Sequence, residues 1–245
     1  MTTASRSPRC YALVPAAGVG ERSGAGMPKQ YVEIAGRPLL AHTLAALASV
    51  PRIVQTLVVL SPADDRFEAA LPDCAAWVAR VGGASRAESV LGGLAELRRR
   101  GAGDDDWVLV HDAARCLLRP EWVDALIEAC LPDAVGGLLA QPIADTLKSG
   151  DAEGRVTATV DRRDKWAAQT PQMFRLGLVE KALTAMGAAA TDEASAVEAL
   201  GLAPLLVRAS MANFKVTWPE DFEMAQSLLI RQCDAALAAD GPGGS

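Results

Sequence analysis

The stretch that decides the fold is residues 11–30, YALVPAAGVGERSGAGMPKQ. It begins with a short apolar run typical of a buried strand, turns through small residues, and continues into a loop that carries Arg22 and Lys29. Small residues let a backbone approach a ligand closely, and free N–H groups in such a turn bind phosphate oxygens. Arginine and lysine bind the phosphate charge directly. The stretch therefore predicts a strand that leads into a nucleoside triphosphate site.

This loop matches neither of the common phosphate-binding motifs. The pattern GxxxxGK[ST] is absent, because Lys29 follows Pro28 and precedes Gln30. The pattern GxGxxG is half present, because Gly18 and Gly20 fit but Ser23 stands at the position of the third glycine. On this segment alone, an ordinary tight turn between a strand and a helix is an open alternative.

The composition of the whole chain narrows the class of protein. Its 245 residues suit one α/β domain or two small ones, and we expect a single domain over residues 9–231 with flexible tails at 1–8 and 239–245. No apolar run reaches the roughly 18 residues of a membrane span, and no secretory signal is expected. Five scattered cysteines without a CxxC pair indicate a reduced, cytoplasmic setting, and the net charge of −6 argues against nucleic-acid binding.

Strand and helix patterns alternate along the chain, and this alternation indicates an α/β fold with a mostly parallel, Rossmann-like sheet covered by helices on both faces. The expected strands are Tyr11–Ala16, Thr56–Ser61, Trp77–Val81, Trp107–His111, Gly137–Gln141 and Pro204–Ala209. The expected helices are Pro38–Ser49, Asp64–Leu71, Arg86–Arg100, Glu121–Cys130, Leu176–Met186, Glu193–Leu200 and Pro219–Ile230, with Ser85 and Thr191 as candidate N-caps.

Residues 142–170 interrupt this alternation. Two short β-like pieces, Thr146–Lys148 and Val156–Val160, flank a polar turn at Ser149–Arg155, which is the pattern of a β-hairpin inserted into the domain. Because isolated hairpins are marginally stable, we expect this arm to pack on something else, such as a second subunit.

Ligands of open α/β sheets bind beyond the carboxyl ends of the strands, and several polar segments lie at such ends. Besides the first loop, they are GGASRAES at residues 82–89 and VHDAAR, in which Asp112 and Arg115 follow an apolar strand. A carboxylate at that position can hold Mg²⁺ together with phosphates and water. A simple capping role for Asp112 is the alternative.

Four later segments carry hydroxyl groups and charges. Each of them alone is typical of a helix cap or a solvated surface, but together with the first loop they suit a phosphorylated polyol. They are Asp145-Thr146 with Lys148, Asp161-Arg162, Thr191-Asp192-Glu193 and Asn213-Phe214-Lys215.

Taken in order, these motifs resemble the 2-C-methyl-D-erythritol 4-phosphate cytidylyltransferases of the non-mevalonate isoprenoid pathway. The resemblance covers roughly residues 10–231 and rests on the combination rather than on any single motif. The matching segments are PAAGVGER…PKQY, GGASRAES, VLVHDAAR, PIADTLK, TVDR…AAQTPQMF, TDEASAVE and NFKVT.

The resemblance implies transfer of CMP from CTP to the polyol phosphate with release of pyrophosphate, in the presence of Mg²⁺ or another divalent cation. Arg22 and Lys29 match the catalytic cations. The other implied site residues are Pro15, Ala16, Ala17, Gly18, Gly20, Gly83 and Ser89 for CTP; Asp112, Arg115, Thr146, Arg162, Thr191 and Lys215 for the second substrate; and Asp112 for the metal, which the CTP phosphates would mainly hold. It also implies a homodimer in which the arm reaches the neighbouring subunit.

Elementary chemistry agrees with this implied reaction. A phosphate monoester has a second pKa of about 6, so the nucleophile is already anionic at pH 7 and needs no general base. The protein's task is to bring two anions together and to stabilise charge at the α-phosphorus. Three positions depart from the family pattern: Ala84 where an acidic residue is frequent, Cys116 where proline is usual, and Trp218 where arginine is frequent.

Other functions stay open on the sequence alone. A sister enzyme, such as a ribitol 5-phosphate or sugar 1-phosphate nucleotidyltransferase, would share the first loop and VHDAAR. A nicotinamide-dependent oxidoreductase would expect a third glycine in register and an acidic residue after the second strand, where Ser61-Pro62 stands instead. A nucleotide-binding regulator without activity is the third alternative, and it is disfavoured by the presence of both Arg22 and Lys29.

Overall fold

The central element of the structure, a computed structural model that describes residues 6–18 and 27–239, is a seven-stranded sheet with the strand order β11-β7-β10-β6-β1-β4-β5. All of its strand pairs are parallel except the two that β10 makes with β6 and β7. The strands are β1 (Cys10–Pro15), β4 (Ile53–Val59), β5 (Trp77–Ala79), β6 (Trp107–Val110), β7 (Gly136–Pro142), β10 (Trp166–Arg175) and β11 (Leu205–Arg208).

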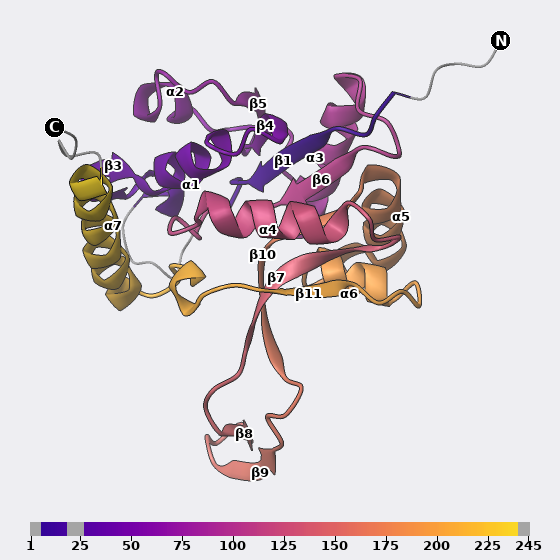
Figure 1. The fold of residues 1–245 in the computed structure, drawn as a ribbon, viewed down its shortest axis with the longest axis vertical. Coiled ribbons are helices and arrows are strands. Elements are labelled where there is room, and N and C mark those ends of the chain that lie inside the picture. The colour runs from indigo at the N-terminus through magenta and orange to yellow at the C-terminus, as the bar shows by residue number, and fades with distance from the viewer. Residues whose placement is uncertain (1–5, 19–26, 240–245) are drawn as a thin grey trace, which may run out of the picture.

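Helices cover the two faces of this sheet (Figure 1). They are α1 (Leu39–Ala48), α2 (Phe67–Ala70), α3 (Arg86–Arg99), α4 (Pro120–Cys130), α5 (Leu176–Met186) and α6 (Glu193–Glu198). The last helix, α7 (Pro219–Ala239), lies to one side of the sheet and packs in a separate cluster with Ile34 and Leu39 (Figure 1). A minor two-stranded sheet of β2 (Glu33–Ile34) and β3 (Arg37–Pro38) precedes α1. The predicted α/β fold with a mostly parallel sheet is therefore confirmed.

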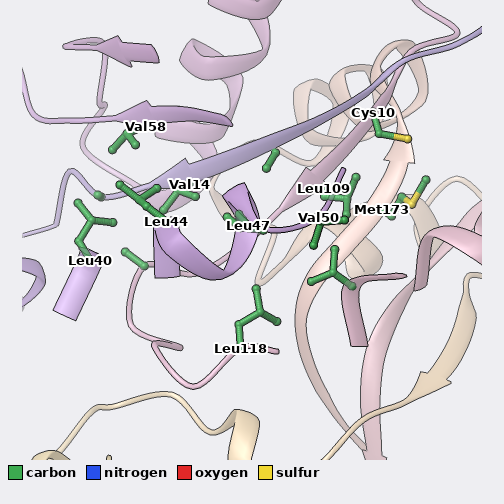
Figure 2. Packing of buried hydrophobic residues seen from close by; sticks show 14 of the residues in the cluster. Cys10, Val14, Leu40, Leu44, Leu47, Val50, Val58, Leu109, Leu118 and Met173 are labelled. Carbon is green, nitrogen blue, oxygen red and sulfur yellow. The ribbon is translucent and has the colours of Figure 1, made fainter. Parts of the chain in front are cut away.

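The side chains of β1 show why both faces need a cover. Ala12 and Val14 point into a cluster with α1 and α4, whereas Tyr11 and Leu13 point into a second cluster with α3 and α5. Figure 2 shows part of the first cluster, with Leu44 and Leu47 of α1 among the labelled side chains near the sheet. Because successive side chains of a strand face opposite ways, an apolar strand of this kind is stable only between two layers of helices.

The helix starts follow the sequence signals, with one correction. Ser85 caps α3 as predicted, and its hydroxyl accepts a hydrogen bond from the backbone N–H of Glu88. For α6 the cap is Asp192 rather than Thr191: its carboxylate accepts from the N–H of Ser195, whose hydroxyl in turn accepts from the N–H of Asp192. Aspartate is the cap because this reciprocal pair of hydrogen bonds, a capping box, satisfies two backbone N–H groups at the start of the helix that would otherwise have no partner.

The strand β10 was not predicted and corrects the boundary of the inserted segment. The expected hairpin ran to residue 170, but the chain rejoins the sheet at Trp166 and continues to Arg175 between β6 and β7. The sequence did not predict this strand, because a proline inside an otherwise β-like segment argues against a central strand. Here Pro171 lies at a register shift between Ala168 and Gln172, where the ladder is interrupted and no N–H is needed.

The tip of the inserted segment is a separate two-stranded sheet of β8 (Leu147–Gly150) and β9 (Val156–Val160). It extends away from the body of the molecule on the long ends of β7 and β10 (Figure 1). Val156 is 64% exposed and Trp166 is 36% exposed, so apolar side chains of this arm face outward.

Among the helices that the structure describes, none combines the length and the apolar character needed to cross a membrane.

Candidate active site

A cavity of about 480 Å³ lies at the carboxyl ends of β1 and β6, where ligands of open α/β sheets bind. Its wall is formed by the turn after β1, the loop before α3, the turn after β6 and a residue of the segment before α7. The lining residues are Pro15, Ala16, Ala17, Gly18, Lys29, Gln30, Leu39, Gly83, Ala84, Ser85, Arg86, Ser89, Asp112, Ala113, Ala114 and Lys215.

The turn after β1 is held by side chains of the segment that follows the first loop. The amide of Gln30, which is buried, donates to the carbonyl oxygen of Ala16 at 2.9 Å. The ammonium group of Lys29 donates to the carbonyl oxygen of Val216 at 2.7 Å and points into the same cavity. The short 3₁₀ turn Lys29–Tyr31 thus ties the predicted phosphate turn to the segment that carries Lys215.

Asp112 lies at the centre of a cluster of cations. Its carboxylate is 3.0 Å from Nε of Arg86, 3.0 Å from Nζ of Lys215 and 3.6 Å from Nε of Arg115. Burial alone would raise the pKa of Asp112, but Arg86, Lys215 and Arg115 outweigh burial and hold its pKa well below the usual range. The carboxylate is therefore ionised at neutral pH, so Asp112 has no proton to donate as a general acid, and its low pKa makes it a weak base.

Arg86 joins this cluster to a second buried carboxylate. Two of its nitrogens donate to the two oxygens of Glu193, at 2.6 and 3.0 Å, and the side chain of Glu193 is fully buried. Burial raises the pKa of Glu193, and the bidentate contact with Arg86 opposes that effect. Arg86 therefore connects the first turn of α3 with the first turn of α6, across the ends of the sheet.

A second cavity of about 200 Å³ adjoins the first and shares Arg86, Asp112 and Lys215 with it. Its other lining residues are Arg115, Ala168, Gln169, Thr170, Gln172, Thr191 and Asp192. Nη1 of Arg115 donates to the carbonyl oxygen of Asn213 at 2.7 Å, but Nε of Arg115 is buried and makes no hydrogen bond with the described residues. Among these residues, only the ion pair with Asp112, at 3.6 Å, compensates this buried donor, so a ligand oxygen could still form a hydrogen bond with it.

His111 lies behind this wall and has a structural role. The hydroxyl of Thr170 accepts from the N–H of Asp112 and lies 3.0 Å from Nδ1 of His111, whose Nε2 lies 3.3 Å from the carbonyl oxygen of Arg115. Burial lowers the pKa of His111 to about 4, so the ring is neutral at pH 7. The hydrogen-bond pattern then assigns the proton to Nε2, and the histidine fixes the turn that carries Asp112.

The structure gathers most of the predicted site residues that it describes. Pro15, Ala16, Ala17, Gly18, Lys29, Gly83 and Ser89 line the first cavity, Arg115 and Thr191 line the second, and Asp112 and Lys215 line both. Gly20 and Arg22 fall outside the described residues. Thr146 and Arg162 are exposed on the arm and line neither cavity.

A metal site made of protein alone is not seen in the described part of the chain, where no group of three or more His, Cys, Asp or Glu side chains could hold an ion. The single carboxylate of Asp112 at the junction of the cavities fits a different arrangement. Mg²⁺ commonly binds one or two carboxylates and takes its other ligands from substrate phosphates and water. The residues therefore fit a divalent ion that arrives with a triphosphate.

Comparison with known proteins identifies the family. Residues 10–231 match the family model described as IspD, 2-C-methyl-D-erythritol 4-phosphate cytidylyltransferase. The chain belongs to this family.

Two relatives and a solved structure illustrate how far the similarity to the IspD family extends. A 2-C-methyl-D-erythritol 4-phosphate cytidylyltransferase of Laribacter hongkongensis is 55% identical over 225 residues, covering 90% of this chain and 96% of the relative. A bifunctional IspD/IspF enzyme of Albidiferax ferrireducens is 58% identical over 226 residues, which span 91% of this chain but 54% of that relative. A crystal structure of a 4-diphosphocytidyl-2C-methyl-D-erythritol synthase superposes with a TM-score of 0.80 at 43% identity, covering 91% of this chain and all of that one.

Sequence reasoning missed several polar residues of the IspD-type site. Arg86, Gln30, Gln169 and Gln172 all lie in the matching segments, but their residue types alone did not predict a role, and Gln169 and Gln172 belong to the unpredicted strand β10. A signal existed for Arg86, because an arginine next to a helix N-terminus is opposed by the helix dipole and needs a carboxylate partner. Nothing local in the sequence marks Glu193 as that partner, since it lies 107 positions away.

Proposed function

We propose that the two adjoining cavities hold the two substrates of an IspD reaction, with CTP in the larger cavity and 2-C-methyl-D-erythritol 4-phosphate reaching the smaller one. The products are 4-diphosphocytidyl-2-C-methyl-D-erythritol and pyrophosphate. The observation that supports this proposal is that Arg86, Asp112 and Lys215 line both cavities, so that substrates bound in the two would meet at these residues.

The reaction is a single displacement. An anionic oxygen of the polyol phosphate attacks the α-phosphorus of CTP, a new P–O bond forms, and the bond from the α-phosphorus to the bridging oxygen breaks to release pyrophosphate. No proton has to be removed from the nucleophile at neutral pH. His111 and Asp112 agree with this, because the lowered pKa of each makes it a weak base at neutral pH.

The cations carry the catalytic work in this proposal. Lys29 and Arg22 stabilise the charge that develops on the α-phosphoryl group and the leaving pyrophosphate, and Lys215 stands between the two substrates. The backbone of Pro15–Gly18 and Gly20 binds the triphosphate, and Gly83 and Ser89 shape the base pocket. Arg115, whose Nε makes no hydrogen bond with the described residues, would bind the phosphate of the polyol, with Thr191 beside it.

A divalent ion such as Mg²⁺ would be held by Asp112 and the CTP phosphates, and it would supply further neutralisation of the triphosphate. Before such an ion binds, Asp112 holds Arg86, Lys215 and Arg115 close together against their mutual repulsion. The carboxylate thus keeps the cations assembled for two highly charged substrates.

We also propose that the protein acts in the cytoplasm as a homodimer whose arm completes the neighbouring site. The exposed Val156 and Trp166 of the arm suit a protein partner, and Thr146 and Arg162 on the same arm would then reach the partner's polyol phosphate. The described cysteines Cys10, Cys74, Cys116 and Cys130 are free thiols, which suits a reducing compartment.

A split between the two Michaelis constants tests this assignment of cavities. Arg115→Ala should raise the KM for the polyol phosphate by about tenfold or more, because it removes a charged donor worth about 1.5–3 kcal/mol, and should leave the KM for CTP within about twofold. An equal rise in both constants would contradict the separate cavities.

A further inference from the structure

The loop at residues 82–84 uses all three of its backbone N–H groups inside the protein. The N–H of Gly82 donates to the carbonyl oxygen of Leu60 at 2.8 Å. The N–H of Gly83 donates to the hydroxyl of Ser89 at 3.1 Å, and the N–H of Ala84 donates to a carboxylate oxygen of Glu88 at 2.9 Å. Two of these acceptors are side chains in the first turn and a half of α3.

The carbonyl groups of the same loop are not used in this way. Within the described part of the chain, no hydrogen bond ends on the carbonyl oxygens of Gly83 or Ala84, whereas that of Ser85 accepts from both the N–H and the hydroxyl of Ser89. Gly83 and Ala84 both line the 480 Å³ cavity. At these two residues, both of which line the cavity, the loop therefore has unused acceptors and no unused donor.

The position of Glu88 is determined by its neighbours. A Cβ atom on Gly83 would lie 2.4 Å from Cβ of Glu88 and 2.7 Å from its carboxylate, so only glycine lets this side chain lie over the loop. The N–H of Glu88 is held by the hydroxyl of Ser85, the cap of α3, at 3.1 Å. The contact between Glu88 and Ala84 is therefore built into the start of the helix.

We propose that Glu88 is a positioning residue that sets the base preference of the cavity by occupying the N–H of Ala84. The inference rests on the proposed function and adds how CTP is distinguished from UTP. Cytosine presents an amino donor at position 4, which the unused carbonyl oxygens accept. Uracil presents a carbonyl oxygen there, and two acceptors facing each other leave both unpaired. The loop thus reads the amino group although Ala84 has no side-chain acceptor.

Three triphosphates test this on the unaltered protein: CTP, UTP, and the pyrimidin-2-one riboside triphosphate, which carries only hydrogen at position 4. With the polyol phosphate as co-substrate, kcat/KM should fall in the order CTP, pyrimidin-2-one triphosphate, UTP, with CTP about 10- to 100-fold above UTP. UTP at or above the pyrimidin-2-one analogue would show that acceptors facing position 4 do not set the preference, and the proposal would be overturned.

Variants of Glu88 test its role directly. Glu88→Ala frees the N–H of Ala84, so the ratio of kcat/KM for CTP to that for UTP should fall at least about fivefold, the value of one hydrogen bond. Glu88→Gln retains an accepting oxygen and should keep the ratio within about twofold. Glu128→Ala, the same substitution at an exposed site on α4, should leave it unchanged.

An unchanged ratio in a folded Glu88→Ala protein would overturn the proposal. If that variant does not fold, the triphosphate series on the unaltered protein decides alone. Failure of the proposed function itself looks different, because the unaltered protein would then consume no CTP with the polyol phosphate at all.

Discussion

Nζ of Lys215 lies 3.0 Å from a carboxylate oxygen of Asp112, and this pair forms the boundary between the two cavities. The contact joins the turn after β6 to the segment before α7, which are separated by about 100 residues of sequence. Because Arg86 and Arg115 approach the same carboxylate, the pair belongs to a network in which one anion holds three cations together.

Removing the charge of Asp112 should therefore destabilise the protein. Asp112→Asn leaves three neighbouring cations without their common partner, and we expect a loss of about 3–5 kcal/mol in the free energy of unfolding, measured by urea denaturation. Asp124→Asn is the matched control, because its ion pair with Arg52 is on the surface and such pairs contribute about 0–1 kcal/mol.

The pH dependence of this difference follows from the depressed pKa of Asp112. The stabilisation is fully present above the unfolded-state value of about 4 and is lost only as the pH falls through the lower pKa of the folded protein. The gap between the parent and Asp112→Asn should thus stay constant from pH 8 to about pH 5. A gap that closes in this range would contradict the network.

His111 predicts a pH effect in a different range. Its pKa is lowered to about 4 by burial, so the unfolded chain binds this proton more readily than the folded one below about pH 6.5. Stability should fall by roughly 2–4 kcal/mol from pH 7 to pH 4 on this account. In His111→Gln, measured by chemical denaturation, the free energy of unfolding should fall by roughly 2–4 kcal/mol less than in the parent between pH 7 and pH 4. His42 is half-buried, and His42→Gln should differ less from the parent over the same range.

Lys29 and Arg22 predict a catalytic effect without loss of the fold. Replacing either by alanine should lower kcat by about 100-fold or more, since each would act as a positioned charge donor in the transition state. Circular dichroism should show the parent's fold. Lys181→Ala, at an exposed position of α5, is the control. A kcat within threefold of the parent would remove that residue from the catalytic set.

The arm predicts dependence on a partner subunit. Replacing Ser149–Arg155 by a short turn removes the end of β8 and the loop to β9. An isolated hairpin is only marginally stable, so the arm is expected to pack on the partner subunit. Losing its tip should therefore raise the dissociation constant of the dimer at least about tenfold. Sedimentation equilibrium measures this. Finding the unaltered protein monomeric at micromolar concentration would refute the arm's role.

The sequence predicted those parts of the fold in which local signals agree. The strand beginning at Tyr11 and the helix beginning at Arg86 combine an apolar pattern with a clear turn or cap, and both formed within a residue or two of the expected bounds. The sequence did not predict strand β10, because Pro171 locally indicates a break, whereas the pairing of this strand with β6 and β7 depends on distant residues. Local propensity cannot show such tertiary pairing.

The same distinction applies to the candidate site. Lys29, Asp112 and Lys215 were recognisable because each lies in a motif whose residue types suit phosphate binding. Glu193 lies in one of the charged segments, but its pairing with Arg86 was not predicted, since the contact spans 107 positions and each residue alone is an ordinary charged residue at a helix start. Only the three-dimensional arrangement shows that Arg86 belongs to both cavities.

The most direct test of the central claim is pyrophosphate release from each of the four nucleoside triphosphates, with 2-C-methyl-D-erythritol 4-phosphate, with ribitol 5-phosphate and with neither. The account predicts rapid release only when CTP and 2-C-methyl-D-erythritol 4-phosphate are both present with a divalent ion, and formation of 4-diphosphocytidyl-2-C-methyl-D-erythritol. Equal or faster release with ribitol 5-phosphate, or with a purine triphosphate, would contradict it.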